Sequence, residues 1–247
     1  MKKVAVVGAS GFVGKAIVRQ SKNYKDLSIV EVTRENFEDC KKETYDVVIN
    51  TAMPSKRYWA LNNPVEDILE TVVKTSKIFY EWKYDKFVQI STVSAETQLD
   101  IPYGSHKKVA EEIVRNLDPN ALIVRLGSLY GEGLSKSALY DIANKKHFYV
   151  DIDSEYDYVD VDFVGKWILE NLSSKGIKKI GAKDTISLRE VCKKFWSSPT
   201  FEGRLEKICF QKPEKGMPSS REVIKFLERI TGEKDEKKVS SHPIGTH

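Results

Sequence analysis

The sequence has few cysteines and no long apolar run, and these two deficits exclude several classes of protein. Its 3 cysteines in 247 residues lie far apart, at Cys40, Cys192 and Cys209. They form neither a CxxC pair nor a metal-ligand pattern, so we expect reduced intracellular thiols and no metal site. No stretch reaches the roughly 18–20 apolar residues of a membrane span. The apolar run before Gly8 is too short for a signal-peptide core. These features predict a cytoplasmic protein without a membrane partner.

A large charge of one sign is also lacking. The chain has 40 Lys+Arg against 36 Asp+Glu, a formal net charge of +4. This charge is too small and too dispersed to indicate a nucleic-acid binder, although it is compatible with an anionic small ligand. Apolar residues make up 40% and charged residues 31%, which is typical of a globular chain and not of a disordered one. The length suits one α/β domain with additions, or two small lobes.

Short apolar runs alternate with helical patterns over the first half of the chain. Strands are expected at residues 4–7, 27–33, 46–50, 86–91 and 121–125. Helices are expected from about residue 13, at 65–82 and at 105–116. This alternation predicts parallel βαβ units, and hence an α/β fold with a doubly wound parallel sheet. After residue 129 the pattern weakens, with an alternating strand at 156–161 and helices at 139–144, 163–172, 187–195 and 219–230.

A glycine-rich turn, Gly8-x-x-Gly11-x-x-Gly14, lies between the first predicted strand and the helical pattern after it. In that context the first glycine permits the tight turn, the second lets a pyrophosphate approach the backbone, and the third lets helix and strand pack closely. The helix N-terminus adds N–H donors and positive potential. The spacing differs from the GxGxxG of the standard dinucleotide fingerprint, and an ordinary glycine-rich βα turn is the alternative interpretation.

The turn assigns the first part of the chain to a dinucleotide-binding Rossmann domain. We expect this domain to span residues 1–130 and to be rejoined by about 156–172. Residues 131–155 and 173–232 are expected to form a small C-terminal substrate lobe. The charged end of the chain, residues 233–247, is expected to be a flexible tail.

The end of the second predicted strand, Glu31-Val32-Thr33-Arg34, should choose between the two nicotinamide cofactors. A carboxylate there binds the ribose 2′-hydroxyl of NAD, whereas an arginine accepts the 2′-phosphate of NADP. Glu31 alternates within the strand, where its carboxylate can simply face solvent. Arg34 stands where the strand ends, and its guanidinium suits bidentate phosphate contact. The pattern favours NADP(H) over NAD(H), with a plain surface arginine as the alternative.

A Tyr103-x-x-x-Lys107 pair follows at the start of a predicted helix. Residues at i and i+4 lie on one helix face. A lysine ammonium one turn from a phenol lowers the phenol pKa from its ordinary value, which makes a usable general acid/base. The lysine could also hold a cofactor ribose. Alone the pair is common by chance and reads as an exposed helix start, but its joint occurrence with the glycine turn makes chance a poor explanation.

A hydroxyl partner is expected at the end of the preceding strand. Ser91 and Thr92 both lie there, where an open α/β sheet places its ligand crevice. Either hydroxyl could bind the substrate oxygen that Tyr103 protonates. The alternative is a strand-end turn that uses Ser and Thr for backbone hydrogen bonds.

Together these motifs resemble the extended short-chain dehydrogenase/reductases, and more narrowly their nucleotide-sugar epimerase/dehydratase/reductase group. The resemblance rests on the glycine turn, Ser91-Thr92, Tyr103-x-x-x-Lys107 and the segment RLGSLYG at 125–131. Asn63-Pro64 and the segment DYVDVD at 157–162 are also similar to that group. The resemblance covers about residues 2–195, and its motifs are specific jointly, in order and in spacing.

The resemblance implies NAD(P) bound on the Rossmann sheet and a nucleoside-diphosphate sugar held under the small lobe. It implies a catalytic set of Thr92, Tyr103 and Lys107. It implies cofactor contacts from Gly8, Ser10, Gly11, Phe12, Val13, Gly14, Arg34, Ala52, Tyr103 and Lys107. Substrate contacts are expected from Thr92, Ser94 and Ser128. Members of the group often dimerise through two helices, here near 65–82 and 105–116, so a homodimer is also expected.

The chain departs from the group at several positions. Dehydratases carry an Asp-Glu pair after the catalytic threonine, whereas Val93-Ser94 follows Thr92 here, which disfavours 4,6-dehydration. Bifunctional epimerase-reductases carry a cysteine in the same region, and its absence disfavours C3/C5 epimerisation. Residues that often contact the substrate or its diphosphate are replaced as well, because Ser128 stands for an asparagine and Tyr156 for an arginine. Thr71 stands for a further asparagine of the group.

The sequence thus predicts an NAD(P)(H)-dependent oxidoreductase or epimerase acting on a nucleotide sugar, by 4-keto reduction or C4 epimerisation. The missing substrate-type residues and the short lobe support an alternative, a non-catalytic NAD(P)-binding sensor or scaffold of the same fold. RNA binding is a third interpretation, which the dispersed charge and the lack of a basic–aromatic stripe disfavour. The expected partner is a small molecule and not a nucleic acid.

Overall fold

The computed structural model of the chain describes the backbone of residues 1–239 and the side chains of residues 1–232. A six-stranded sheet forms its centre, with strands in the order β2-β1-β3-β4-β5-β9 and all pairs parallel. The strands are β1 (Lys2–Val7), β2 (Leu27–Val32), β3 (Thr44–Asn50), β4 (Lys83–Thr92), β5 (Leu122–Leu126) and β9 (Gly176–Ile180). The predicted doubly wound parallel sheet is therefore confirmed.

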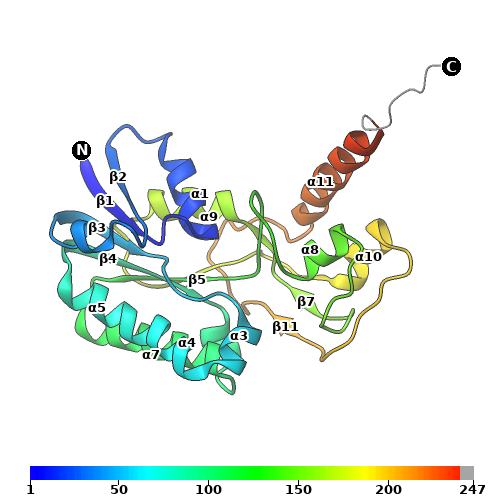
Figure 1. The fold of residues 1–247 in the computed structure, drawn as a ribbon, viewed down its shortest axis with the longest axis horizontal. Coiled ribbons are helices and arrows are strands. Elements are labelled where there is room, and N and C mark those ends of the chain that lie inside the picture. Colours follow the sequence, from blue (N-terminus) through cyan, green and yellow to red (C-terminus); the bar gives the residue numbers. More distant parts are fainter. Residues whose placement is uncertain (240–247) are drawn as a thin grey trace.

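Helices cover both faces of this sheet (Figure 1). On one face α1 (Phe12–Ser21) packs against α9 (Val161–Glu170). The other face carries α4 (Pro64–Ile68), the π-helical turn η1 (Leu69–Val73), α5 (Lys74–Glu81) and α7 (Pro102–Leu117). The inner strands are buried on both sides because two apolar clusters fill these layers, one around Val4, Val6 and Ile49 and one around Ala5, Val48 and Phe87.

The strand order places the crevice of the sheet. The chain moves outward from β1 to β2 and then returns to the far side of β1 with β3, so the direction of winding changes between β1 and β3. Ligands of doubly wound sheets bind at the carboxyl ends of the strands beside such a switch point. Only the short helix α2 (Phe37–Cys40) lies between β2 and β3. The glycine turn follows β1 directly, so it lies at this switch point.

The C-terminal lobe (residues 129–160 and 181–239) is built from short elements around a third apolar cluster. Its strands are β6 (Leu129–Tyr130), β7 (Glu155–Tyr156), β8 (Val159–Asp160), β10 (Ile186–Ser187) and β11 (Lys207–Ile208). Its helices are α8 (Ala138–Ala143), α10 (Leu188–Phe195) and α11 (Glu222–Val239). Helix α10 begins with a capping box between Ser187 and Glu190, as their spacing predicts.

Two segments in the second half of the chain differ from the predicted boundaries. Strand β9 belongs to the central sheet, whereas the sequence predicts that residues 173–232 belong to the lobe. It is an edge strand with two lysines, and only Ile180 is fully buried, so it carries no apolar run. The alternating segment 156–161 forms parts of two separate two-residue strands, because Asp157 and Tyr158 turn away between β7 and β8. Both differences arise from tertiary pairing.

The predicted tail is only partly outside the fold. Helix α11 continues to Val239, so the backbone of residues 233–239 is helical in the segment where a tail is expected. This segment is rich in Glu and Lys, which are good helix formers. Residues 240–247 lie outside the described part of the chain. Among the described residues, no helix combines the length and the apolar character needed to cross a membrane.

Candidate active site

The three predicted catalytic residues meet at the carboxyl edge of the sheet. Thr92 is the last residue of β4, and Tyr103 and Lys107 lie one turn apart in α7. The Lys107 Nζ lies 5.3 Å from the centroid of the Tyr103 ring. The Thr92 side chain lies close enough to the Tyr103 hydroxyl to act on its pKa. Tyr103 is 8% and Lys107 3% exposed, so this cluster is largely shielded from water.

The strand alternation decides between the two hydroxyls at the end of β4. Ser91 is buried, and its hydroxyl donates a 2.6 Å hydrogen bond to the Glu111 carboxylate. Glu111 in turn pairs with the buried guanidinium of Arg125. Successive side chains of a strand point to opposite faces, so the neighbouring Thr92 faces Tyr103. Thr92 is therefore the hydroxyl available to a ligand at this edge.

The pKa of Tyr103 differs from the prediction. Burial raises the pKa of this phenol above its ordinary value, and the charge of Arg57 and the nearby Thr92 side chain oppose this rise only in part. Burial also lowers the pKa of Lys107 to about 7, against the opposing effect of Asp67. The expectation that Lys107 lowers the phenol pKa is therefore wrong here. The physical reason is that the same burial disfavours the charged form of both groups.

Lys107 is held by the loop that follows β3. Its Nζ donates a 2.8 Å hydrogen bond to the carbonyl of Pro54. Asp67 of α4 is fully buried, and its carboxylate lies 2.7 Å from the imidazole of His106, the residue before Lys107. The other oxygen of Asp67 and the hydroxyl of Thr71 are buried without a hydrogen-bond partner. Asp67 is thus the carboxylate that favours the charged form of Lys107.

The glycine turn has the backbone geometry that its sequence predicts. Gly8 has φ +86°, and a Cβ there would lie 2.8 Å from Thr51 Oγ1 and 2.9 Å from the Cα of Ala52. A Cβ on Gly14 would lie 2.3 Å from the Gly8 carbonyl oxygen, so only glycine lets α1 start this close to the turn. At Gly11 a Cβ would meet only that same oxygen, at 3.1 Å, and the remaining space is open.

Other predicted cofactor contacts surround this turn. Ser10 is exposed, and Phe12 and Val13 begin α1. The amides of Gly8 and Ala9 donate to the carbonyl of Val32, which brings the end of β2 beside the turn. The first turn of α1 holds no acidic residue that would repel a phosphate. These residues fit a dinucleotide, with its pyrophosphate on the backbone of the turn.

Arg34 lies just beyond β2, in a tight loop. The amide of Thr33 donates to the Asn36 side chain at 2.8 Å, and the Asn36 amide group donates to the Glu31 carbonyl at 2.9 Å. The Arg34 side chain is exposed, and Glu31 also faces solvent. Arg34 forms no salt bridge with a described residue, although its charge helps to lower the pKa of the neighbouring Glu35. The loop therefore presents the Arg34 guanidinium beside the glycine turn.

The predicted substrate contacts lie on both sides of the crevice. Ser94 is buried at the start of α6 (Ser94–Thr97), where its amide donates to the Thr92 hydroxyl. Ser128 is half-buried after β5, and its amide donates to the buried Asp157 carboxylate. Burial raises the pKa of Asp157 to about 7. The backbone amide of Ser128 therefore already has a hydrogen-bond partner within the protein.

The structure adds one group that the sequence reasoning missed. Arg57, the first residue of α3 (Arg57–Asn62), forms two 2.9 Å contacts with the carboxylate of Glu206 in the C-terminal lobe. The Tyr156 hydroxyl donates to the same carboxylate at 2.8 Å. This arrangement ties the lobe to the Rossmann domain beside Tyr103. The only sequence signal for this pair is that Arg57 follows the end of β3 by a few residues. Its partner Glu206 lies 149 positions away in the chain, so the sequence does not reveal the contact.

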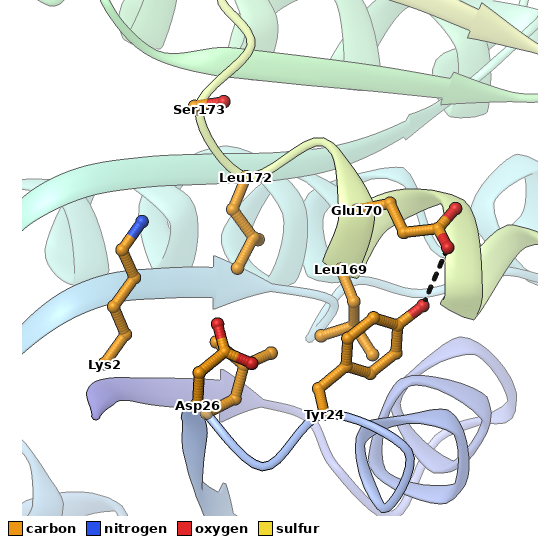
Figure 2. A pocket seen from close by; sticks show the side chains of 8 residues that line it. Lys2, Tyr24, Asp26, Leu169, Glu170, Leu172 and Ser173 are labelled. Atoms are coloured by element: carbon orange, nitrogen blue, oxygen red, sulfur yellow. Dashed lines mark hydrogen bonds between the residues drawn. The ribbon is translucent and has the colours of Figure 1, made fainter.

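A hollow of 110 Å³ lies at the opposite edge of the sheet, and Figure 2 shows the side chains that line it. It lies at the amino ends of β1 and β2, and the hydroxyl of Tyr24 donates to Glu170 at 3.1 Å on its rim. It is shallow and open, and it contains none of the predicted site residues. Within residues 1–232 we also find no cluster of three His, Cys, Asp or Glu side chains suited to a metal ion.

Comparisons with known proteins agree with this architecture. No curated protein sequence matches the chain. The chain is similar in structure to a UDP-glucose 4-epimerase from Thermotoga maritima determined with UDP-glucose, at 16% identity and a TM-score of 0.74, covering 96% of this chain and 99% of that one. It is also similar to a dTDP-4-dehydrorhamnose reductase from Bacillus anthracis in complex with NADP, at 17% identity and a TM-score of 0.70, covering 94% and 98%.

A third similar structure is a UDP-N-acetylglucosamine 4-epimerase from Methanobrevibacter ruminantium, at 13% identity and a TM-score of 0.72, covering 96% and 99%. At these identities the structures support the fold alone. The family pattern described as "NAD dependent epimerase/dehydratase family" matches residues 4–169, about two thirds of the chain. With the glycine turn and the Thr92, Tyr103 and Lys107 cluster in place, the chain belongs to the NAD dependent epimerase/dehydratase family.

Proposed function

We propose that this protein reduces the keto group of a nucleotide sugar with NADPH, or interconverts C4 epimers of such a sugar with a bound NAD(P). The observation that carries the proposal is the contact of Thr92, Tyr103 and Lys107 at the carboxyl edge of the sheet. The similar structures named above include epimerases and reductases of nucleotide sugars, which supports the same substrate class here.

In this mechanism the protein positions the sugar and moves one proton. The nicotinamide cofactor, when bound, supplies or accepts the hydride. The Thr92 hydroxyl orients the ketone oxygen, and the Tyr103 hydroxyl donates the proton to that oxygen in the reductive direction. A phenol is protonated at neutral pH, as a proton donor must be, and burial raises the pKa of Tyr103 further. Lys107 holds the cofactor ribose, and an anionic ligand nearby favours its charged form.

Replacing Tyr103 with Phe tests the proposal directly. The variant keeps the ring that packs at the site and removes the proton donor. We expect turnover of a keto-sugar nucleotide to fall by at least ~100-fold, while NADPH binding stays unchanged. Tyr149→Phe is the matched control, because Tyr149 is 72% exposed in the C-terminal lobe. Full activity of Tyr103→Phe would refute the assignment.

A non-catalytic sensor or scaffold is the second candidate. It is supported by Tyr156, whose hydroxyl is already bound to Glu206 at the position where the related enzymes carry an arginine. The two candidates differ in one measurement, the oxidation of NADPH in the presence of a panel of keto-sugar nucleotides. Consumption of NADPH supports the enzyme, whereas tight NADPH binding without consumption on any panel member supports the sensor.

We propose NADP(H) as the preferred cofactor. The support is the exposed guanidinium of Arg34, which forms no salt bridge with a described residue and lies beside the glycine turn. Two oxygens of a 2′-phosphate can accept parallel hydrogen bonds from this guanidinium. Glu31, the competing carboxylate for a ribose 2′-hydroxyl, lies one residue inside β2 and faces solvent.

We also propose a homodimer formed through α4, η1, α5 and α7. These elements pack side by side, and several of their apolar side chains are exposed. The exposed apolar residues of these elements are Val65, Ile68, Leu69, Val73, Tyr80, Val109 and Leu117. Exposed apolar residues gathered on packed helices can form a protein–protein interface.

A further inference from the structure

We propose that Lys56 and Lys136, from opposite sides of the crevice, form a clamp for the diphosphate of the nucleotide substrate. The inference rests on the proposed function for the identity of that ligand. It concerns two lysines that neither the catalytic cluster nor the glycine turn uses.

The two lysines reach the crevice from different parts of the fold. Lys56 immediately precedes α3, on the loop whose Pro54 carbonyl holds Lys107. Lys136 belongs to the loop 131–137 between β6 and α8 in the C-terminal lobe. The Lys136 Nζ donates a 2.8 Å hydrogen bond to the hydroxyl of Ser55, so this loop crosses to the Rossmann domain beside Lys56.

The same loop also approaches the glycine turn. A Cβ on Gly133 would lie 3.9 Å from the Phe12 ring at the start of α1. Loop 131–137 therefore runs from the glycine turn to the loop that holds Lys107. A ligand that reaches Tyr103 past this loop passes Lys136.

The charges around this opening are unbalanced. Arg57 is neutralised by Glu206, and Asp67 lies near Lys107. Glu132, the carboxylate of the crossing loop, faces Arg19 at 3.6 Å instead. Neither Lys56 nor Lys136 forms an ion pair with any residue whose side chain the structure describes.

The two lysines also act on each other. Partial burial, together with the charge of Lys56, lowers the pKa of Lys136. Two cations held together without a carboxylate are relieved by an anion between them. A diphosphate supplies at least two negative charges and several acceptor oxygens, and lysines bind phosphate as point charges.

A second diphosphate site is needed if the substrate is a nucleotide sugar. The backbone of the glycine turn already accounts for the pyrophosphate of the cofactor. The substrate brings its own diphosphate to the same crevice, and its sugar must end at Tyr103. Lys56 and Lys136 provide the unpaired positive charge at the entrance to that position.

The test measures nucleoside-diphosphate binding and requires no turnover. The full chain is saturated with NADPH, which fills the glycine turn, and UDP, dTDP and inorganic pyrophosphate are titrated by calorimetry. We expect Lys56→Ala and Lys136→Ala each to weaken the affinity for the probe that binds wild type best by roughly tenfold, and the double variant by roughly a hundredfold. Lys136→Arg should retain most of the affinity, because it keeps the charge.

Two lysines outside the crevice serve as matched controls. Lys22 and Lys215 are exposed and, like Lys56, form no ion pair with a described residue. Their alanine variants should bind the probes as wild type does. The affinity for NADPH should be unchanged in all variants, which also shows that the variants fold.

Three results would overturn the clamp. They are wild-type binding by the double variant, the absence of probe binding to the NADPH-saturated wild type, and a loss of NADPH affinity in place of probe affinity. The last result would assign the lysines to the cofactor. Failure of the proposed function is a separate outcome. If UDP binding depends on the two lysines but no keto-sugar nucleotide is turned over, the proposed function fails and the clamp is supported.

Discussion

At the residue scale, the site combines buried groups whose charge is costly with exposed groups whose charge is free. Tyr103 and Lys107 belong to the first kind, and burial moves the pKa of each toward its neutral form. Arg34 and Lys56 belong to the second kind, whereas Lys136 is exposed but partly shielded, so that burial lowers its pKa. None of the three forms a salt bridge with a residue whose side chain the structure describes. The chemistry therefore takes place among shielded groups, while the exposed cations are available for phosphates.

Lys107 makes stability depend on pH. Its folded pKa of about 7 lies below its ordinary value of 10.5, so the folded state must hold an unfavourable buried charge below pH 7. This penalty is full below pH 7 and is relieved as pH rises toward about 10.5, where the unfolded chain also loses the proton. Replacing Lys107 with Met removes the charge in both states.

We therefore expect Lys107→Met to be inactive yet more stable than wild type at pH 6.5, by no more than about 5 kcal/mol. The gain should shrink steadily toward pH 10, as measured by urea unfolding across this range. Lys108→Met is the control, because Lys108 is partly exposed and pairs with Glu112. A gain of equal size at all pH values would show that Lys107 is not a buried cation.

Arg34 carries the prediction on cofactor choice. Its guanidinium contributes to NADPH binding but not to NADH binding, because only NADPH has the 2′-phosphate. Arg34→Ala should weaken NADPH binding by roughly tenfold to a hundredfold and leave NADH binding unchanged, as measured by fluorescence titration. Arg221, an exposed arginine of the lobe that pairs with Glu190, provides the control position. An unchanged ratio of the two affinities would remove Arg34 from the site.

At the element scale, the position of α7 decides whether the catalytic residues meet. The helix approaches α6 so closely that a Cβ on Gly104 would lie 2.0 Å from the carbonyl oxygen of Gln98 and 2.5 Å from that of Ser94. Both are backbone atoms that cannot rotate away. Gly104 lies between Tyr103 and Lys107, so a displacement of α7 moves both side chains relative to Thr92.

We expect Gly104→Ala to destabilise the protein by about 1–3 kcal/mol, the usual cost of overpacking, and to lower turnover as well. Thermal unfolding and NADPH oxidation measure the two effects. Gly232→Ala in α11 is the matched control, because a Cβ there meets no atom within 4 Å. That variant should be neutral or slightly stabilised, since alanine favours a helix interior. Wild-type stability of Gly104→Ala would contradict the close packing of α7.

At the scale of the whole molecule, two features link parts of the structure that are distant in sequence. The pair of Arg57 and Glu206, with Tyr156, joins the Rossmann domain to the C-terminal lobe beside the site. The apolar face on α4, η1, α5 and α7 is the surface on which a second copy of the chain is proposed to pack. The first feature joins the two parts of one chain, and the second leaves exposed apolar side chains on the helices of the Rossmann domain.

The dimer predicts a mass near twice the 28.2 kDa of one chain in light scattering after size exclusion. Val65→Glu with Leu69→Glu places two charges in the proposed interface and should yield the monomer. Tyr149→Glu is the control, because Tyr149 is 72% exposed and belongs to the C-terminal lobe. A wild-type monomer at micromolar concentration, or a dimeric double variant, would exclude this interface.

The sequence by itself determined the features that depend on neighbours in the chain. The glycine turn follows from the φ of Gly8 and the close approach at Gly14, and the i, i+4 spacing of Tyr103 and Lys107 sets them on one helix face. The capping box at Ser187 is equally local. Each needs only a few adjacent residues, so short-range sterics and hydrogen bonding suffice to predict it.

Only the tertiary structure decided the features that depend on burial and on distant partners. It placed the lysine-rich β9 in the sheet, joined Arg57 to Glu206, and turned Ser91 toward Glu111 while leaving Thr92 at Tyr103. It also reversed the expected shift of the Tyr103 pKa. The cost of burying a charge depends on everything packed around it, which spacing along the chain does not specify.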